Sequence, residues 1–184
     1  MDEMRINVAE SDALLLIDVQ RDFCAGGALA VPDADTIIPV LNGCIDVAVE
    51  SGIPVYASRD WHPLRHISFR EQGGTWPPHC LAGSEGALFH PGLHLPESTV
   101  HITKGVCFDR DQISVFDQTG FAQQLRRDGV LRLWAGGLAL DVCVLASVLT
   151  AMENGFAVHL LATATRPVTR EGGEEALQKI RQPG

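Results

Sequence analysis

Reactive side chains follow short apolar runs at several points in this sequence of 184 residues. The runs, which are typical of buried parallel strands, occupy residues 13–17, 53–58, 99–103 and 130–135. The reactive residues that come after them are Asp18, Asp60, His62, Lys104 and Cys143. Because ligands of an open parallel sheet bind beyond the carboxyl ends of its strands, we expect an acid, a base, a nucleophile and a metal site to meet at one edge. This pattern predicts an enzyme.

Cys143 is the candidate nucleophile. It lies in the first turn of a predicted helix, where the helix dipole lowers the pKa of a thiol and backbone N–H groups can hold an oxyanion. The alternative is a buried core cysteine, which is the commoner interpretation for a lone cysteine flanked by Val142 and Val144. Asp18 and Lys104 favour catalysis, since Asp18 could take the thiol proton and Lys104 could keep Asp18 ionised. A structural ion pair explains these two residues equally well.

Asp60, His62 and His79 have the composition of a zinc site, with one carboxylate, two imidazoles and positions left open for water or substrate. In an extended segment Asp60 and His62 point to the same side, because side chains alternate with a period of two. His66 and Cys80 are auxiliary candidates. Asp-x-His is common by chance, so the spacing alone does not establish a metal site.

Alternating strand and helix patterns indicate one α/β domain with a mostly parallel sheet over residues 1–184. The first helix is expected to start near Asp33 or Asp35, either of which could cap it, and to end at Gly52. The fourth strand runs into Gly136 and Gly137. Further helices are expected at 121–127, from 141 to about 154 and at 171–180, and a last strand at 156–161.

The segment from about 60 to 98 shows no sustained period and is rich in glycine and proline, which indicates a long functional loop. Its tryptophans and histidines argue against disorder. Phe23, Trp61 and Trp76 are candidates to line a pocket for a flat ring, or they simply fill core beneath the loop. Trp76, beside two prolines, is the strongest candidate for a wall.

The composition excludes several classes of protein. With 46% hydrophobic and 20% charged residues, the chain has the makeup of a soluble globular protein. Its net charge is −9 and it has no block of Lys or Arg, which argues against a nucleic-acid partner. No apolar stretch approaches the roughly 18 residues of a membrane span, and residues 1–5 show no signal-peptide pattern. We therefore expect a cytoplasmic protein without a membrane partner.

The five cysteines are scattered and form no C-x-x-C pair, which argues against a disulfide framework or a zinc ribbon. We expect them to be reduced. Apart from Cys143, most are predicted to be small buried hydrophobic residues: Cys24, Cys44, Cys80 and Cys107.

Several segments, in order from about residue 13 to 167, resemble nicotinamidases of the isochorismatase-like hydrolase superfamily. The matching segments are 18–23, 58–63, 66–69, 76–80 and 137–144. The resemblance implies a single doubly wound parallel sheet with helices on both faces. It also implies a triad of Cys143 as nucleophile, Asp18 as base and Lys104 as third member. The implied metal ligands are Asp60, His62 and His79, with zinc as the expected ion and iron or manganese as alternatives.

The same resemblance assigns the pocket. The Leu138–Ala139 bond maps to a cis peptide, and the amides of Ala139 and Cys143 map to the oxyanion hole. Phe23 and Trp76 map to aromatic walls, and in such enzymes the pyridine nitrogen of nicotinamide faces the metal. The sequence departs from this family at two positions. Some relatives have an additional metal ligand near the position of His66, but their loop differs in length from the loop here. Ile113 stands where tyrosine is common.

The implied activity is the hydrolysis of nicotinamide to nicotinate and ammonia through a thioester on Cys143. The nearest alternative is another hydrolase of the superfamily, acting on an N-carbamoyl compound, a related small amide or isochorismate. Cys143 argues against isochorismate and the metal ligands argue against the carbamoyl hydrolases. A non-catalytic zinc-binding or regulatory protein is a third possibility, which the intact triad disfavours. We expect the chain to form a homo-oligomer and to bind a small-molecule substrate.

Overall fold

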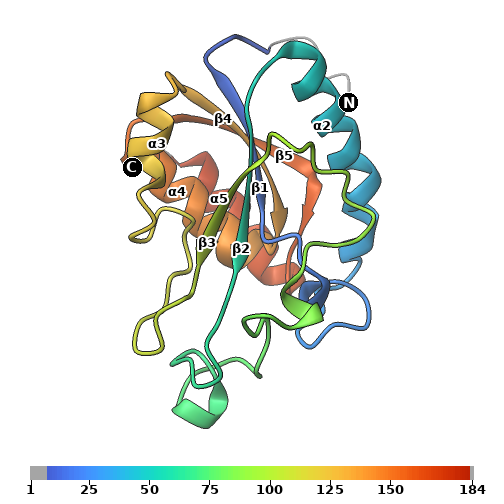
Figure 1. Ribbon diagram of the computed structural model, residues 1–184, viewed down its shortest axis with the longest axis vertical. Helices are drawn as coiled ribbons and strands as arrows, with labels where there is room; N and C mark the ends of the chain where they lie inside the picture. Colours follow the sequence, from blue (N-terminus) through green and yellow to red (C-terminus); the bar gives the residue numbers. More distant parts are fainter. Residues whose placement is uncertain (1–7, 183–184) are drawn as a thin grey trace.

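Figure 1 shows the computed structural model of the protein, in which residues 8–182 are described. Its sheet is parallel throughout, with the strand order β3-β2-β1-β4-β5. The strands are β1 (Asp12–Ile17), β2 (Val55–Asp60), β3 (Val100–Lys104), β4 (Arg132–Leu138) and β5 (Ala157–Arg166). The chain leaves β1 toward β2 and β3, and then returns to build β4 and β5 on the other side. Ligands of such sheets bind where the strand order reverses, which here is between β1 and β4.

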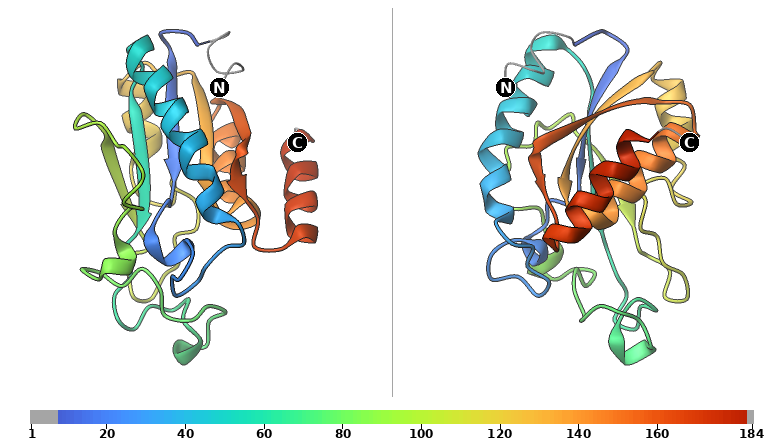
Figure 2. Two further views of the ribbon diagram at one scale, coloured as in Figure 1. Left: turned by 90° about the vertical axis from the view of Figure 1, so that its right-hand side faces the viewer. Right: turned by 180° about the vertical axis from the view of Figure 1, so that it is seen from behind.

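Helices cover both faces of this sheet (Figure 2), as the resemblance implied. The helices are α2 (Ile38–Ser51), α3 (Phe121–Arg127), α4 (Leu145–Glu153) and α5 (Arg170–Arg181). Leu14 and Leu16 of β1 pack in one core with α2, whereas Leu15 and Ile17 pack in the other with α3, α4 and α5. Because side chains alternate along a strand, the apolar run of β1 supplies both cores.

The start of α2 differs from the prediction. A 3-10 turn, η2 (Ala34–Ile37), comes first, and neither Asp33 nor Asp35 caps the helix with its side chain. The Asp35 carboxylate instead accepts a hydrogen bond from the Ala25 N–H at 2.8 Å and lies 3.2 Å from a ring nitrogen of His90. The end of α2 is as predicted, at Gly52 in the left-handed conformation with φ 69°.

β4 starts two residues later than predicted and continues through both glycines. Gly136 pairs with Leu16, and Gly137 pairs with Ile17. A side chain at Gly137 would overlap the backbone of Ile17, and its φ of 126° is one that other residues rarely adopt. The glycine pair therefore lets β4 approach β1 closely at the end where the reactive residues gather.

The remaining segments are mostly irregular. β4 leads into a π-helical turn, η5 (Leu140–Val144), where an ordinary helix start was expected. The long loop after β2 holds two 3-10 turns, η3 (Arg70–Gln72) and η4 (Glu85–Ala87), and a third, η1 (Arg21–Phe23), follows β1. All five cysteines are free, as predicted. Among residues 8–182, no helix combines the length and the apolar character that crossing a membrane requires.

Candidate active site

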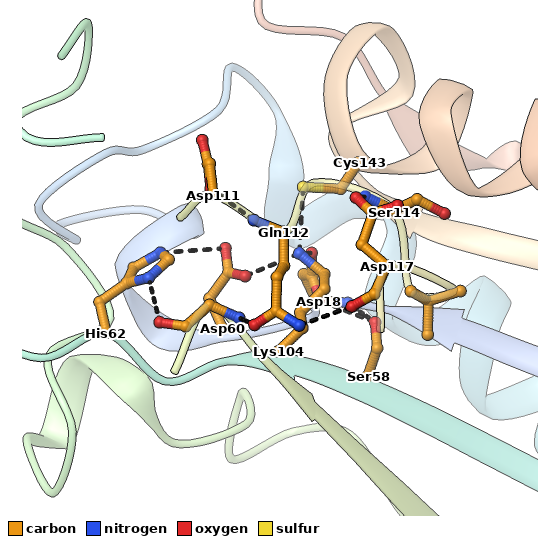
Figure 3. A network of polar contacts seen from close by, with 12 residues as sticks. Asp18, Ser58, Asp60, His62, Lys104, Asp111, Gln112, Ser114, Asp117 and Cys143 are labelled. Carbon is orange, nitrogen blue, oxygen red and sulfur yellow. Dashed lines mark hydrogen bonds and ion pairs between the residues drawn. The ribbon is translucent and has the colours of Figure 1, made fainter. Parts of the chain in front are cut away.

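The carboxyl ends of four strands bring together the three predicted catalytic residues and the predicted metal ligand Asp60 (Figure 3). The ammonium of Lys104, at the end of β3, lies 2.9 Å from Asp18 Oδ2 and 2.6 Å from Asp60 Oδ1. It also lies 3.5 Å from the Sγ of Cys143, in the turn after β4. The expectation that these residues meet at one edge of the sheet is therefore correct for all four.

Burial makes this cluster electrostatically strong. Lys104 and Asp18 are fully buried and Asp60 is nearly so, and charges so placed are stable only when they are paired. Burial alone lowers the pKa of Lys104, but the two carboxylates outweigh it and raise that pKa well above its usual value. Burial likewise opposes the ionisation of Asp60, but Lys104 holds the pKa of Asp60 below its usual range. Lys104 is thus a permanent cation shared by two carboxylates.

Asp18 has the properties of a base. Its backbone is left-handed, with φ 49°, which turns the chain away from the sheet just after β1. Ser58 Oγ donates a hydrogen bond to Oδ1 at 2.7 Å. Oδ2 lies beside the Lys104 ammonium. Burial raises the pKa of Asp18, so Oδ2 is well suited to receive a proton.

The thiol of Cys143 differs from the expectation. The side chain is only 8% exposed, and burial raises the pKa of this thiol well above its usual value although Lys104 opposes the shift. The expected lowering by the helix dipole is therefore wrong, because the loss of solvent outweighs it. Burial therefore favours the protonated thiol, and a protonated thiol has to lose its proton as the sulfur attacks.

The donor set of Asp60, His62 and His79 fits a divalent ion, since one ligand atom of each lies within 4.8 Å of the others. His62 Nδ1 lies 2.9 Å from the carbonyl oxygen of Gly105, and His79 Nδ1 lies 2.8 Å from that of Pro77. Each Nδ1 therefore donates its hydrogen to a carbonyl, which leaves the Nε2 lone pair for a metal. Asp60 uses Oδ1 for Lys104, and its Oδ2 lies 3.6 Å from His62 Nε2.

The auxiliary candidates do not join this group of ligands in the described part of the chain. His66 stacks on His62, with ring centroids 4.1 Å apart. However, its Nδ1 lies 2.7 Å from Ser68 Oγ and its Nε2 lies 3.2 Å from the carbonyl oxygen of Arg110. Both nitrogens of His66 are therefore already engaged.

A pocket of about 510 Å³, its open mouth included, borders the cluster. Phe23 and Trp76 line it, as predicted, whereas Trp61 packs under the guanidinium of Arg59 instead. Asp60, His62 and His79, which we call the ligand group, also line the pocket, together with Lys104 and Cys143. The rest of the lining is mainly aliphatic: Leu29, Val31, Ile113, Ala139, Val142 and Val168. The Leu138–Ala139 bond is cis, as the resemblance implied. The pocket is thus apolar with a few convergent polar groups, which is typical of small-molecule sites.

Sequence reasoning did not single out Gln20, which is fully buried between two segments of the site. Its Oε1 accepts a hydrogen bond from the Asp60 N–H at 2.7 Å. Its Nε2 donates to the carbonyl oxygens of Asp60 and Ala87, both at 2.8 Å. Gln20, which follows the turn after β1, therefore fixes the backbone of Asp60 at the end of β2. Its position two residues after Asp18 was the only signal for this role.

Comparisons with known proteins place this chain in a family. The model of the isochorismatase domain family matches residues 12–184. The nicotinamidase of Escherichia coli (strain K12) is 39% identical, over 89% of this chain and 87% of its own. The structure of the pyrazinamidase of Pyrococcus horikoshii in complex with zinc is 44% identical, with a TM-score of 0.91 over 93% of this chain and 94% of that one. The structure of PnC1 from L. infantum in complex with nicotinate is 35% identical, with a TM-score of 0.88 over 96% of this chain and 91% of that one.

Proposed function

This chain belongs to the isochorismatase domain family and is an amidohydrolase, and from this premise we propose that it hydrolyses nicotinamide to nicotinate and ammonia. The observation that carries the proposal is the Lys104 ammonium, which touches Asp18, Asp60 and the sulfur of Cys143 at the floor of one pocket. The nicotinamidase of E. coli and the nicotinate complex of the L. infantum protein support this choice of substrate.

Acylation begins with the neutral thiol of Cys143. The proton on Sγ moves to Oδ2 of Asp18 as the sulfur attacks the amide carbon, and the carbonyl oxygen takes the negative charge. The backbone N–H groups of Ala139 and Cys143 are proposed to hold that oxygen. Asp18 then gives the proton to the amide nitrogen, the C–N bond breaks and ammonia leaves. Lys104 keeps its proton throughout, and steadies the negative charge of Asp18 before and after each transfer.

Deacylation repeats the proton transfers in reverse. Asp18, ionised again after ammonia leaves, takes a proton from water as the water oxygen attacks the thioester carbon. The C–S bond breaks, and the proton on Asp18 returns to Cys143. The product leaves as nicotinic acid, which carries the second proton of the water and releases it to solvent to become nicotinate. A single carboxylate serves both steps, which agrees with the raised pKa that burial gives Asp18.

Phe23 and Trp76 are proposed to hold the pyridine ring between them, next to the ligand group. Bound by Asp60, His62 and His79, a divalent ion (zinc, or else iron or manganese) would supply a Lewis-acid contact for the ring nitrogen. This contact would orient the ring and leave the scissile bond to Cys143.

Nicotinamide is expected to be hydrolysed on the order of 100-fold or more efficiently than benzamide, because a site that holds one polar atom rejects analogues that lack it. Benzamide has the same amide and nearly the same shape but no ring nitrogen. The measurement is kcat/KM for ammonia release from both amides, with an N-carbamoyl compound added to test the rival activity. Removing the metal with a chelator should shrink the preference for nicotinamide. Comparable efficiencies for the two amides would contradict ring-nitrogen recognition.

The purified protein is expected to carry about one divalent ion per chain, since two imidazoles and one carboxylate make a typical open zinc site. The double substitution His62→Ala with His79→Ala should abolish binding, because Asp60 alone rarely holds zinc. His94→Ala is the matched control, since this histidine is exposed and lies outside the ligand group. Metal analysis of the three proteins is the measurement. Full occupancy in the doubly substituted protein would place the ligands elsewhere.

A further inference from the structure

The peptide group between Gly105 and Val106 is hydrogen-bonded to a side chain at each end. Its carbonyl oxygen, on Gly105, lies 2.9 Å from Nδ1 of His62. Its N–H, on Val106, donates to Oε1 of Gln112 at 3.3 Å, and the N–H of Gly105 donates to the same oxygen at 2.9 Å. One continuous chain of hydrogen bonds therefore runs from the His62 ring, through a single peptide group, to the amide of Gln112 (Figure 3).

Gln112 is held in one orientation. It is only 4% exposed, and its Nε2 donates to the carbonyl oxygen of Asp117 at 2.5 Å. Because Oε1 faces two N–H groups while Nε2 faces a carbonyl, only one of the two possible amide orientations satisfies every partner. The N–H of Gln112 itself is accepted by Oδ1 of Asp111 at 2.9 Å. Both its backbone and its side chain are therefore anchored in the loop after β3.

The contact between this loop and His62 depends on a close approach of the backbone. Gly105 has φ +68°, which favours glycine, and any side chain there would overlap the His62 ring. The absence of a side chain lets the Gly105 carbonyl reach Nδ1. The carbonyl cannot be removed by substitution, so Gln112 is the side chain through which its position can be altered.

The orientation of the carbonyl decides which nitrogen of His62 is available to a metal. A neutral imidazole carries one N–H, and a carbonyl facing Nδ1 keeps the hydrogen there and the lone pair on Nε2. Nε2 is the nitrogen that faces Asp60. If the peptide group turned, His62 would lose both its preferred tautomer and the partner that fixes its ring plane.

We propose that Gln112 is a positioning residue for His62. It fixes the Gly105–Val106 peptide group and, through the Gly105 carbonyl, the tautomer and ring plane in which His62 Nε2 serves as a metal ligand. This inference rests on the proposed metal site at Asp60, His62 and His79. It assigns a role to a residue that lines the pocket but whose side-chain polar atoms bond to backbone groups of the protein.

Gln112→Leu tests the inference, because leucine keeps most of the bulk but removes the acceptor. Thr119→Val is the matched control in the same loop. It removes the bond that Thr119 Oγ1 donates to the Val115 carbonyl at 2.6 Å and the one that it accepts from the Phe121 N–H at 3.2 Å, and it leaves the bonds of Gln112 in place. The measurements are the zinc dissociation constant by chelator competition, the visible spectrum of the Co²⁺-substituted protein, and thermal unfolding of the metal-free protein. Gln112→Met serves the same purpose if the leucine variant does not fold.

Gln112→Leu is expected to weaken zinc binding about 10-fold, the lower end of the range for outer-shell partners of metal ligands, and to change the cobalt spectrum. Thr119→Val should leave both unchanged even if it lowers the unfolding temperature. If Gln112→Leu lowers only the unfolding temperature and keeps the affinity and spectrum of the parent, the inference is wrong and the residue is merely structural. His62→Ala separates the two proposals, since parent-like zinc affinity in that variant would overturn the metal site itself.

Discussion

Replacing Cys143 with alanine is expected to abolish nicotinamide hydrolysis while the fold stays intact. Without Sγ no thioester forms, and losing a catalytic nucleophile reduces kcat by roughly 10⁵-fold or more in comparable hydrolases. Alanine fits the same turn, and the lost sulfur borders a pocket that already exists. We therefore expect the free energy of unfolding to change by about 1 kcal/mol or less. Ammonia release and urea unfolding are the two measurements.

Cys107→Ala is the control for this substitution, because Cys107 is partly exposed and lies outside the catalytic cluster and the pocket lining. It should retain parent activity. If Cys143→Ala kept activity within tenfold of the parent, a thiol mechanism at this position would be excluded. A loss of activity accompanied by unfolding would leave the nucleophile to be tested by covalent labelling.

Replacing Lys104 with methionine is expected to reduce both activity and stability. The ammonium pairs with Asp18 and Asp60 in a site without solvent. Removing one partner of a buried ion pair costs about 3–5 kcal/mol, because the remaining charges lie unpaired. Activity should fall on the order of 10³-fold, since Asp18 is no longer held ionised as a base. Ammonia release and the free energy of unfolding at neutral pH are the measurements, with the exposed Lys179→Met as control.

The stability defect of Lys104→Met should depend on pH. Burial already raises the pKa of Asp18, and without Lys104 this pKa rises further. A carboxyl group whose pKa is higher in the folded than in the unfolded protein binds its proton more tightly in the folded state. Its protonated form then stabilises the fold at low pH, and that stabilisation is lost as the pH rises through the folded pKa. The defect should therefore be smallest near pH 4, around the usual pKa of aspartate, and grow toward neutrality. A defect equal at all pH values would contradict this pairing.

The meeting of Asp18, Asp60 and Lys104 could be predicted because of one rule of parallel sheets. Asp18, Asp60 and Lys104 each end an apolar run, and parallel strands present their carboxyl ends at the same edge. The sharing of Asp60 between Lys104 and the proposed metal ligands could not be predicted. It follows from the register that pairs Asp60 of β2 with Lys104 of β3, and this register is set by packing rather than by either segment.

The errors of sequence reasoning have identifiable physical causes. The pKa of Cys143 was predicted to fall because the helix terminus is local and visible in sequence, whereas the burial that raises it comes from packing against residues far away in the sequence. Asp33 or Asp35 was predicted to cap α2, but neither does, and Asp35 is engaged by His90, 55 residues away. Gln20 and Gln112 were not recognised because their partners are backbone atoms, which leave no trace in residue types.

The most direct test of the proposed mechanism uses nicotinaldehyde labelled with ¹³C at the carbonyl carbon. The aldehyde has no leaving group, so attack by Cys143 should stop at a thiohemiacetal: the S–C bond forms and the thiol proton ends on the carbonyl oxygen. We predict that the carbonyl resonance moves to the region of tetrahedral carbon in the parent protein and stays at the aldehyde position in Cys143→Ala. The same tetrahedral signal in Cys143→Ala, or an adduct on Cys24, Cys44, Cys80 or Cys107, would contradict the assignment of Cys143 as the nucleophile.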